Sequence, residues 1–215
     1  MENAEKQIEK KRILYALFIP SGICLMLLLV FLLEKGMDWD FHHAGVFPRK
    51  AKGFWGIFLH AFIHNNWQHL FNNMLSLFVL SAFVCYFYTP LEGKILLLSY
   101  IGCGILLWII GRPSWHIGAS GLVYALSFFL FWSGLFRRYV PLIAVSFIVV
   151  LLYGSEIWYL FPWKETQQIS WEGHLAGGIT GSILSVKYRH CGPQKPIIVD
   201  DEDEVEEDEF NELIT

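Results

Sequence analysis

The stretch ILYALFIPSGICLMLLLVFLL, residues 13–33, contains 21 residues and no charged side chain. At about 1.5 Å of rise per residue, an α-helix of this length crosses a hydrocarbon core of roughly 30 Å. The basic sequence KQIEKKR precedes it, as in a secretory signal peptide, but the apolar run is too long for one and no small-x-small cleavage site follows. We therefore expect a transmembrane helix that is retained in the protein.

Five further apolar segments follow, at residues 67–88, 91–110, 120–136, 140–160 and 173–186. The composition agrees with them. Hydrophobic residues make up 54% of the 215 and aromatic residues 17%, and the mean hydropathy of +0.43 is too high for an ordinary soluble domain. The sequence predicts an all-α, polytopic membrane protein, with a domain of six transmembrane helices over residues 13–190 in a lipid bilayer.

Lysine and arginine gather where this six-helix scheme places loops on one side of the membrane. They precede the first segment, separate the fourth from the fifth and follow the sixth, at Lys6, Lys10, Lys11, Arg12, Arg137, Arg138, Lys187 and Arg189. Loops rich in these residues stay in the cytoplasm, so we expect both termini there. Lys35, Arg49, Lys50 and Lys52 fall in the first outer loop, which weakens the bias without reversing it.

The two ends of the chain differ in charge. Residues 1–12 are expected to form a short cytoplasmic segment, and residues 191–215 an acidic cytoplasmic tail that is disordered, because DDEDEVEEDEFNE buries too little apolar surface. The net charge of −4 comes largely from this tail, and we expect no nucleic-acid partner. The four cysteines show neither a disulfide framework nor metal-type spacing.

Strongly polar residues lie at the outer ends of three segments, where polar groups are costly and therefore point to function. His69 and Asn73 are four residues apart, so a helix projects them from one face. Helix lengths counted from the cytoplasmic basic residues place Ser120 and His174 at similar depths, a few ångströms below the outer surface. We expect all four side chains to meet in one cavity open to the exterior.

Small residues recur every four positions in two segments, at Gly173, Gly177, Gly181, Gly121 and Ala125. This small-xxx-small pattern lets helix backbones approach closely. A histidine acts as a general base for a serine hydroxyl only at about 2.6 to 3.2 Å, and both side chains are short, so their helices must nearly touch. Gly118 and Gly121 flank Ser120 and leave room for a substrate carbonyl beside its hydroxyl and backbone N–H.

Each feature has a simpler explanation when taken alone. A serine among small residues in a transmembrane helix is usually a packing feature, and a histidine at a helix end is usually satisfied by water. His60 and His64, four residues apart, suit Zn²⁺, but no nearby carboxylate or cysteine completes a ligand set. Glu172 is near His174 in sequence, but residues so near one another on a helix point in different directions, so we do not count it as a triad member. Together the residues favour a Ser-His dyad without a metal.

Three stretches also resemble those of a known family. HAFIHNNWQHLFNN (60–73), GASGLVYAL (118–126) and GHLAGGITG (173–181) stand in the order found in rhomboid intramembrane serine proteases, and residues 53–189 resemble that family as a whole. The resemblance implies that Ser120 is the nucleophile and His174 the general base. It implies an oxyanion hole of His69, Asn73 and the Ser120 backbone N–H, supported by His64, Gly118, Gly121 and Tyr124, whose ring would pack against His174.

The same resemblance implies a compact six-helix bundle that cleaves transmembrane proteins in a bacterial cytoplasmic membrane without a cofactor. Two other functions stay open: a catalytically idle rhomboid-like protein that binds membrane clients, and a transporter. The intact Ser120 and His174 argue against the first, and the absence of charged residues from the middle of the segments argues against a proton-coupled transporter. One departure concerns the first outer loop, where many relatives have Trp-Arg and this chain has Trp55-Gly56.

Overall fold

The computed structural model describes residues 2–163 and 169–195. Within these ranges the chain is helical, and no strand is present beyond a single β-bridge between Val46 and His116. The α-helices are α1 (Glu2–Gly36), α2 (Gly56–Leu59), α3 (Trp67–Phe87), α4 (Glu92–Ile110), α5 (Ser120–Arg137), α6 (Val140–Tyr153) and α7 (Trp171–Lys187). Short 3₁₀ helices span His42–Ala44, Ala51–Gly53, His60–Phe62 and Gly154–Leu160. The predicted all-α class is confirmed.

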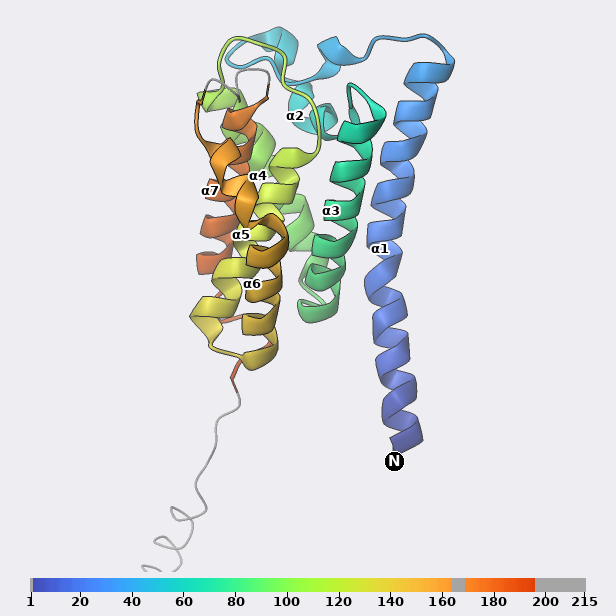
Figure 1. The fold of residues 1–215 in the computed structure, drawn as a ribbon, viewed down its shortest axis with the longest axis vertical. Helices are drawn as coiled ribbons and strands as arrows, with labels where there is room; N and C mark the ends of the chain where they lie inside the picture. Colours follow the sequence, from blue (N-terminus) through green and yellow to red (C-terminus); the bar gives the residue numbers. More distant parts are fainter. Residues whose placement is uncertain (1, 164–168, 196–215) are drawn as a thin grey trace, which may run out of the picture.

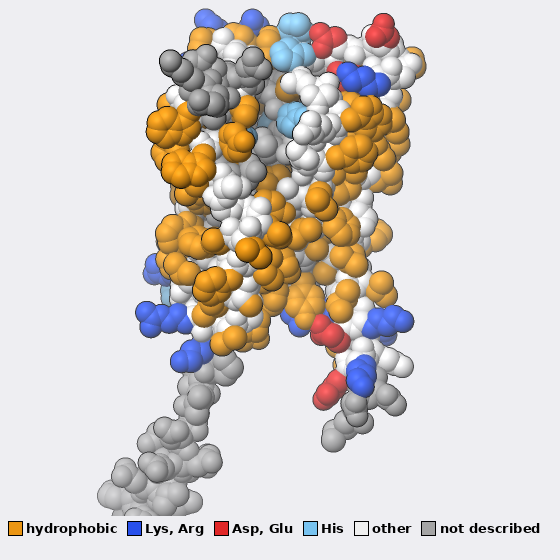
Figure 2. Space-filling view, in the orientation of Figure 1, with side chains coloured by type: hydrophobic (Ala, Val, Ile, Leu, Met, Phe, Trp, Pro, Cys, Tyr) orange, Lys and Arg blue, Asp and Glu red, His pale blue; other side chains and the backbone are white. Residues whose placement is uncertain are grey.

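The protein is an integral membrane protein. Among the described residues, α1, α3, α4 and α5 are long and apolar enough to cross a membrane, and α6 is a shorter apolar helix. Figure 2 shows hydrophobic side chains covering the middle of the molecule, with Lys, Arg, Asp and Glu gathered at its two ends. The predicted count of six spans is therefore met in part, by four long helices and one shorter one.

The helices run up and down, with α5 at the centre of the bundle. Helix α5 packs most extensively against α7 and also contacts α3, α4 and α6, whereas α1 lies at the edge against α3 (Figure 1). The N-terminus of α1 and the C-terminal end of α7 lie at the same end of the bundle. The long first loop and the α4–α5 loop lie at the other end.

Two segment boundaries differ from the prediction. The sequence predicts one span over residues 140–160, but α6 ends at Tyr153 and a 3₁₀ helix covers Gly154–Leu160. At the other end of the chain, α1 begins at Glu2, so the helix includes the basic segment before residue 13. Lys, Glu and Gln are good helix formers, and the Arg12 guanidinium donates to the Tyr86 carbonyl on α3 at 3.0 Å, which holds this extension against the bundle.

Glycine brings α5 and α7 into backbone contact. A Cβ atom added to Gly177 would lie 2.0 Å from the Gly121 carbonyl oxygen, and one added to Gly181 would lie 2.0 Å from that of Ala125. No side chain fits at either position. The close approach predicted from the small-xxx-small pattern is therefore confirmed, and it holds the outer ends of both helices together.

The loop before α2 is fastened to α4, and its position 56 is a glycine. A Cβ on Gly56 would lie 2.0 Å from the Gly45 carbonyl oxygen, so the loop is folded too tightly for any side chain there. Instead the Arg49 guanidinium donates to the Ile109 carbonyl at 2.8 Å, and the Trp108 indole N–H donates to the Lys50 carbonyl at 3.4 Å. Arg49 thus anchors the loop from seven residues earlier in the chain.

Candidate active site

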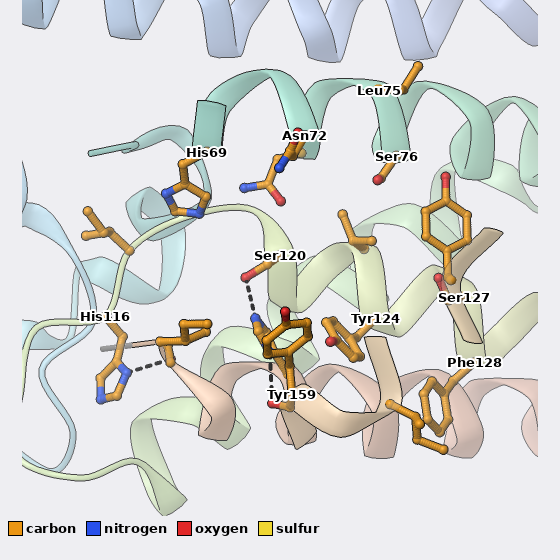
Figure 3. Close-up of a pocket in the computed structure, with 18 of the residues that line it drawn as sticks. His69, Asn72, Leu75, Ser76, His116, Ser120, Tyr124, Ser127, Phe128 and Tyr159 are labelled. Atoms are coloured by element: carbon orange, nitrogen blue, oxygen red, sulfur yellow. Dashed lines mark hydrogen bonds between the residues drawn. The ribbon is translucent and has the colours of Figure 1, made fainter. Parts of the chain in front are cut away.

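Ser120 and His174 meet at the N-terminal ends of α5 and α7. Ser120 is the first residue of α5 and His174 the fourth of α7, and the serine Oγ lies 3.0 Å from the histidine Nε2. The dashed line from Ser120 in Figure 3 marks this hydrogen bond. The spacing falls within the range in which an imidazole can take a hydroxyl proton.

The other ring nitrogen of His174 fixes its tautomer. Nδ1 lies 3.1 Å from the backbone carbonyl oxygen of Tyr159, in the 3₁₀ helix after α6. A carbonyl oxygen can only accept, so Nδ1 carries the proton of the neutral ring. Nε2 then presents its lone pair to the Ser120 hydroxyl, which is the form that a general base requires.

Tyr124 holds the imidazole from one side. It follows Ser120 by one helical turn, and its ring stacks on that of His174 with centroids 4.3 Å apart and planes inclined by 12°. Both side chains are buried. The stacked ring and the Tyr159 carbonyl together restrict how the imidazole can rotate.

His64, His69 and Asn73 form a second polar group beside the serine. The Asn73 amide nitrogen lies 3.0 Å from His64 Nε2, and the rings of His64 and His69 meet edge to face at 4.9 Å. Burial lowers the pKa of His64, in the loop before α3, to about 4. Its neutral ring therefore accepts a hydrogen bond from Asn73, which leaves the second N–H of that amide for another acceptor.

Gly118 brings the backbone before Ser120 against this group. Its φ of +102° lies in the left-handed region that favours glycine. A Cβ there would lie 2.6 Å from His69 Cε1 and 3.8 Å from the Asn73 amide nitrogen. The polar side chains of α3 and the Ser120 backbone therefore border the same small space.

A cavity of about 1000 Å³ opens over these residues. Its lining includes His69, Asn73, Ser120 and His174, together with further residues of α3, α5 and α6. Figure 2 shows histidine side chains beside a recess near the upper end of the molecule. The structure thus brings all four residues predicted from the sequence to one cavity.

The His60–His64 pair, set aside above as a zinc site, does not lie on one helix face. His60 lies in a 3₁₀ helix and residues 63–66 are not helical, so the two rings do not share a helix face. His60 Nδ1 donates to the Gly56 carbonyl at 2.9 Å and the ring stacks on Tyr100, while His64 bonds to Asn73. In the described part of the chain, no three His, Cys, Asp or Glu side chains group as metal ligands.

The sequence predicts no role in the site for several residues that lie near it. The Tyr159 carbonyl is a backbone group, so no residue type marks it. His116, two residues before Gly118, bonds to Ser170, and Glu172, excluded as a triad member, pairs with Arg112. The signal that could have indicated His116 is its position, as an ionisable residue directly before the GASG stretch.

Comparisons with known proteins identify the family of the chain. The model of the Rhomboid domain matches residues 51–191. An uncharacterized protein of Mycobacterium tuberculosis, Rv1337, is 31% identical over 156 residues, which cover 66% of this chain and 62% of that protein. ML1171 of Mycobacterium leprae is 31% identical over 168 residues, 74% of this chain and 66% of the relative.

A more distant relative carries a family name. Rhomboid-related protein 1 of Caenorhabditis elegans is 26% identical over 151 residues, 63% of this chain and 40% of that protein. The match to the Mycobacterium tuberculosis protein spans less than two thirds of its length. The domain match, however, covers most of the chain and includes every residue of the site described above. The chain belongs to the rhomboid family.

Proposed function

We propose that this protein is an intramembrane serine endopeptidase that cleaves transmembrane proteins through a Ser120–His174 dyad. The observation that carries the proposal is the 3.0 Å contact between Ser120 Oγ and His174 Nε2, with Nδ1 bonded to the Tyr159 carbonyl. The tautomer, the distance and the cavity above the pair are those that nucleophilic catalysis requires. A serine that only packs helices needs none of them.

The reaction follows from these positions. The Ser120 oxygen attacks the scissile carbonyl carbon while His174 Nε2 takes the hydroxyl proton. The protonated imidazole then gives that proton to the leaving amine as the C–N bond breaks, which leaves an acyl-enzyme ester on Ser120. Water, deprotonated by the same nitrogen, attacks the ester, releases the new carboxyl group and restores the serine. No cofactor takes part in these steps.

Three donors are proposed to stabilise the oxyanion that forms. His69 and the free N–H of Asn73 face it from α3, and the Ser120 backbone N–H faces it from α5. Ser120 begins α5, so this N–H has no acceptor within the helix, and the positive end of the helix dipole lies at the same point. His64 orients Asn73 through their 3.0 Å hydrogen bond.

The proposed substrates are membrane proteins whose transmembrane segments unwind near the outer face. A peptide bond inside an intact helix is shielded by its own hydrogen bonds, so Gly, Pro or other weak helix formers near the cleavage site should favour cleavage. Residues of α3, α5 and α6 line the cavity, and its volume of about 1000 Å³ leaves room for an extended segment of a substrate.

We further propose that six helices, α1 and α3 to α7, span a bacterial cytoplasmic membrane with both termini inside. The α6 helix and its 3₁₀ extension would together form the fifth span, and α7 the sixth. Mycobacterial relatives support a bacterial setting. The lysine and arginine side chains at the N-terminal end of α1 and near Arg137 support the orientation.

The decisive experiment uses the purified full-length protein in proteoliposomes with a generic transmembrane substrate. Wild-type protein should cleave it and react with a fluorophosphonate at Ser120. Ser120→Ala should abolish both, His174→Ala should suppress both, and Ser21→Ala, which changes an exposed serine on α1, should alter neither. Substrate binding without cleavage or labelling by the wild-type protein would instead indicate an idle, client-binding rhomboid.

A further inference from the structure

The loop between α4 and α5 holds the first turn of α7. The Arg112 backbone N–H donates to Glu172 Oε1 at 3.3 Å, and its side-chain Nε lies 3.6 Å from the same oxygen. Arg112 Nη2 also donates to the Ile169 carbonyl at 2.8 Å, just before the helix. One residue of the loop thus contacts α7 and the segment leading into it.

A second link joins the same two segments. His116 Nδ1 lies 2.6 Å from the Ser170 hydroxyl, and its Nε2 lies 3.1 Å from the Arg112 carbonyl. That carbonyl can only accept, so Nε2 carries the proton and Nδ1 accepts from Ser170. The Ser170 hydroxyl in turn caps α7 by accepting from the Gly173 backbone N–H. We call Arg112, His116, Ser170 and Glu172 the α7 clamp.

The burial of Glu172 shows that this is more than surface pairing. Its side chain is 1% exposed, and among the described residues its second oxygen, Oε2, has no hydrogen-bond partner. An exposed acid at the start of a helix also interacts favourably with the helix dipole, so the dipole does not account for the burial of Glu172. A buried carboxylate instead depends strongly on its cation, so the position of α7 is tied to that of Arg112.

The clamp joins the two stretches of chain that carry the dyad. Ser120 follows Arg112 by eight residues, and His174 follows Glu172 by two. One turn further into the membrane, the Gly177–Gly121 contact holds α5 against α7. His174 therefore lies between two fixed points, and the clamp restrains the first turn of α7 from the side of the nucleophile's own loop.

We propose that the α7 clamp is a positioning device that sets the distance between Ser120 and His174, with Arg112 and Glu172 as positioning residues. This inference rests on the proposed protease function. Loss of the Arg112–Glu172 pair retains both catalytic side chains but lets the first turn of α7, and His174 with it, move relative to Ser120. Misplacement of a reacting group by about 1 Å can lower a rate by about 100-fold.

The test compares two buried glutamates at opposite ends of the molecule. Glu172→Gln removes the charge from the clamp. Glu92→Gln is the matched control, because Glu92 is 6% exposed, begins α4 and accepts a hydrogen bond from Tyr15 at 3.0 Å. Both changes should lower thermal stability. Only Glu172→Gln should lower kcat and the rate of fluorophosphonate labelling, by about 10-fold to 100-fold with KM nearly unchanged.

A double-mutant cycle and hydrogen exchange complete the test. Arg112→Gln combined with Glu172→Gln should lower kcat less than the product of the single effects, because both changes break one contact. Amide exchange at residues 173–175 should accelerate in Glu172→Gln and stay at the wild-type rate in Glu92→Gln. Equal losses of kcat in both glutamate variants, or unchanged exchange in Glu172→Gln, would overturn the clamp.

These readouts separate the clamp from the protease assignment. If wild-type protein neither cleaves nor labels, the protease function fails, and the exchange rate at residues 173–175 still decides whether the clamp holds α7. If wild-type protein is active and Glu172→Gln matches it in kcat and labelling, the clamp fails and the function stands.

Discussion

Gly177 on α7 lies so close to Gly121 on α5 that a Cβ on Gly177 would be 2.0 Å from the Gly121 carbonyl oxygen. Gly121 directly follows Ser120, and Gly177 lies one turn after His174. The contact therefore fixes the separation of the two helices next to the dyad. The distance between Ser120 and His174 is set by the absence of side chains at these glycines as much as by the two residues themselves.

Gly177→Ala should separate the helices and disable the site. The added methyl group has no space, so we expect a stability loss of about 1 to 3 kcal/mol and a strong loss of cleavage. Gly22→Ala is the matched control, because a Cβ there meets no atom within 4 Å and alanine favours the helix. Thermal unfolding and cleavage of both variants give the comparison. An active, stable Gly177→Ala protein would show that the helices need not touch.

Removal of single oxyanion donors should give graded losses. His69→Ala or Asn73→Ala should each lower kcat by about 10²-fold to 10³-fold, because the remaining donors still hold the oxyanion, and KM should change little. The double variant should lose less than the product of the two. His64→Ala should cost less than Asn73→Ala, since it acts through Asn73. Steady-state kinetics on all four variants test this order of losses. An inactive His64→Ala variant, together with active His69→Ala and Asn73→Ala variants, would contradict it.

Acid should destabilise the outer loops through buried histidines. Burial lowers the pKa of His60 and of His64 to about 4 from the usual 6.5, and it lowers that of His116 as well. The unfolded chain then binds more protons than the folded one below pH 6.5. Stability should be full above that pH and fall as the pH drops towards 4, by on the order of a few kcal/mol.

The measurement is the unfolding temperature between pH 7.5 and 4.5. A His64→Gln variant, which lacks one titrating ring, should show a shallower decline, whereas His190→Gln, at an exposed position after α7, should decline like the wild type. A wild-type unfolding temperature that rises on acidification would contradict a lowered histidine pKa in the folded state.

Reporter fusions should reveal the orientation in the membrane. Fusions after Arg138 and after Arg189 should report a cytoplasmic location, and one after Trp163 an outer location, because lysine and arginine favour the inner side. An outer signal after Arg189 would require an odd number of spans.

Much of the site could be predicted from the sequence because each helix carries its own signal. Four-residue spacing placed His69 and Asn73 on one face, and the glycine stripes indicated which helices touch. The predicted roles of these residues stay predictions until they are tested. The four-residue spacing of His60 and His64, considered as a zinc pair and set aside, does not place them on one helix face, because these residues form a 3₁₀ turn and a loop.

Contacts between distant loops could not be predicted in the same way. Arg112 and Glu172 are 60 residues apart, and nothing in their local sequence indicates that they pair. Similarly, the contact of Arg49 with the Ile109 carbonyl follows only from the folded path of the loop. The acidic tail, predicted over residues 191–215, lies largely outside the described residues.

The partner of His174 Nδ1 is a backbone carbonyl, and this changes what mutation can do to the site. No substitution at position 159 removes that oxygen, so a change of the side chain there should leave this hydrogen bond intact. Insertions or deletions within the 3₁₀ helix Gly154–Leu160 would instead shift the carbonyl, so we expect them to be selected against. Selection at this point therefore acts on the number of residues in the segment rather than on the identity of residue 159.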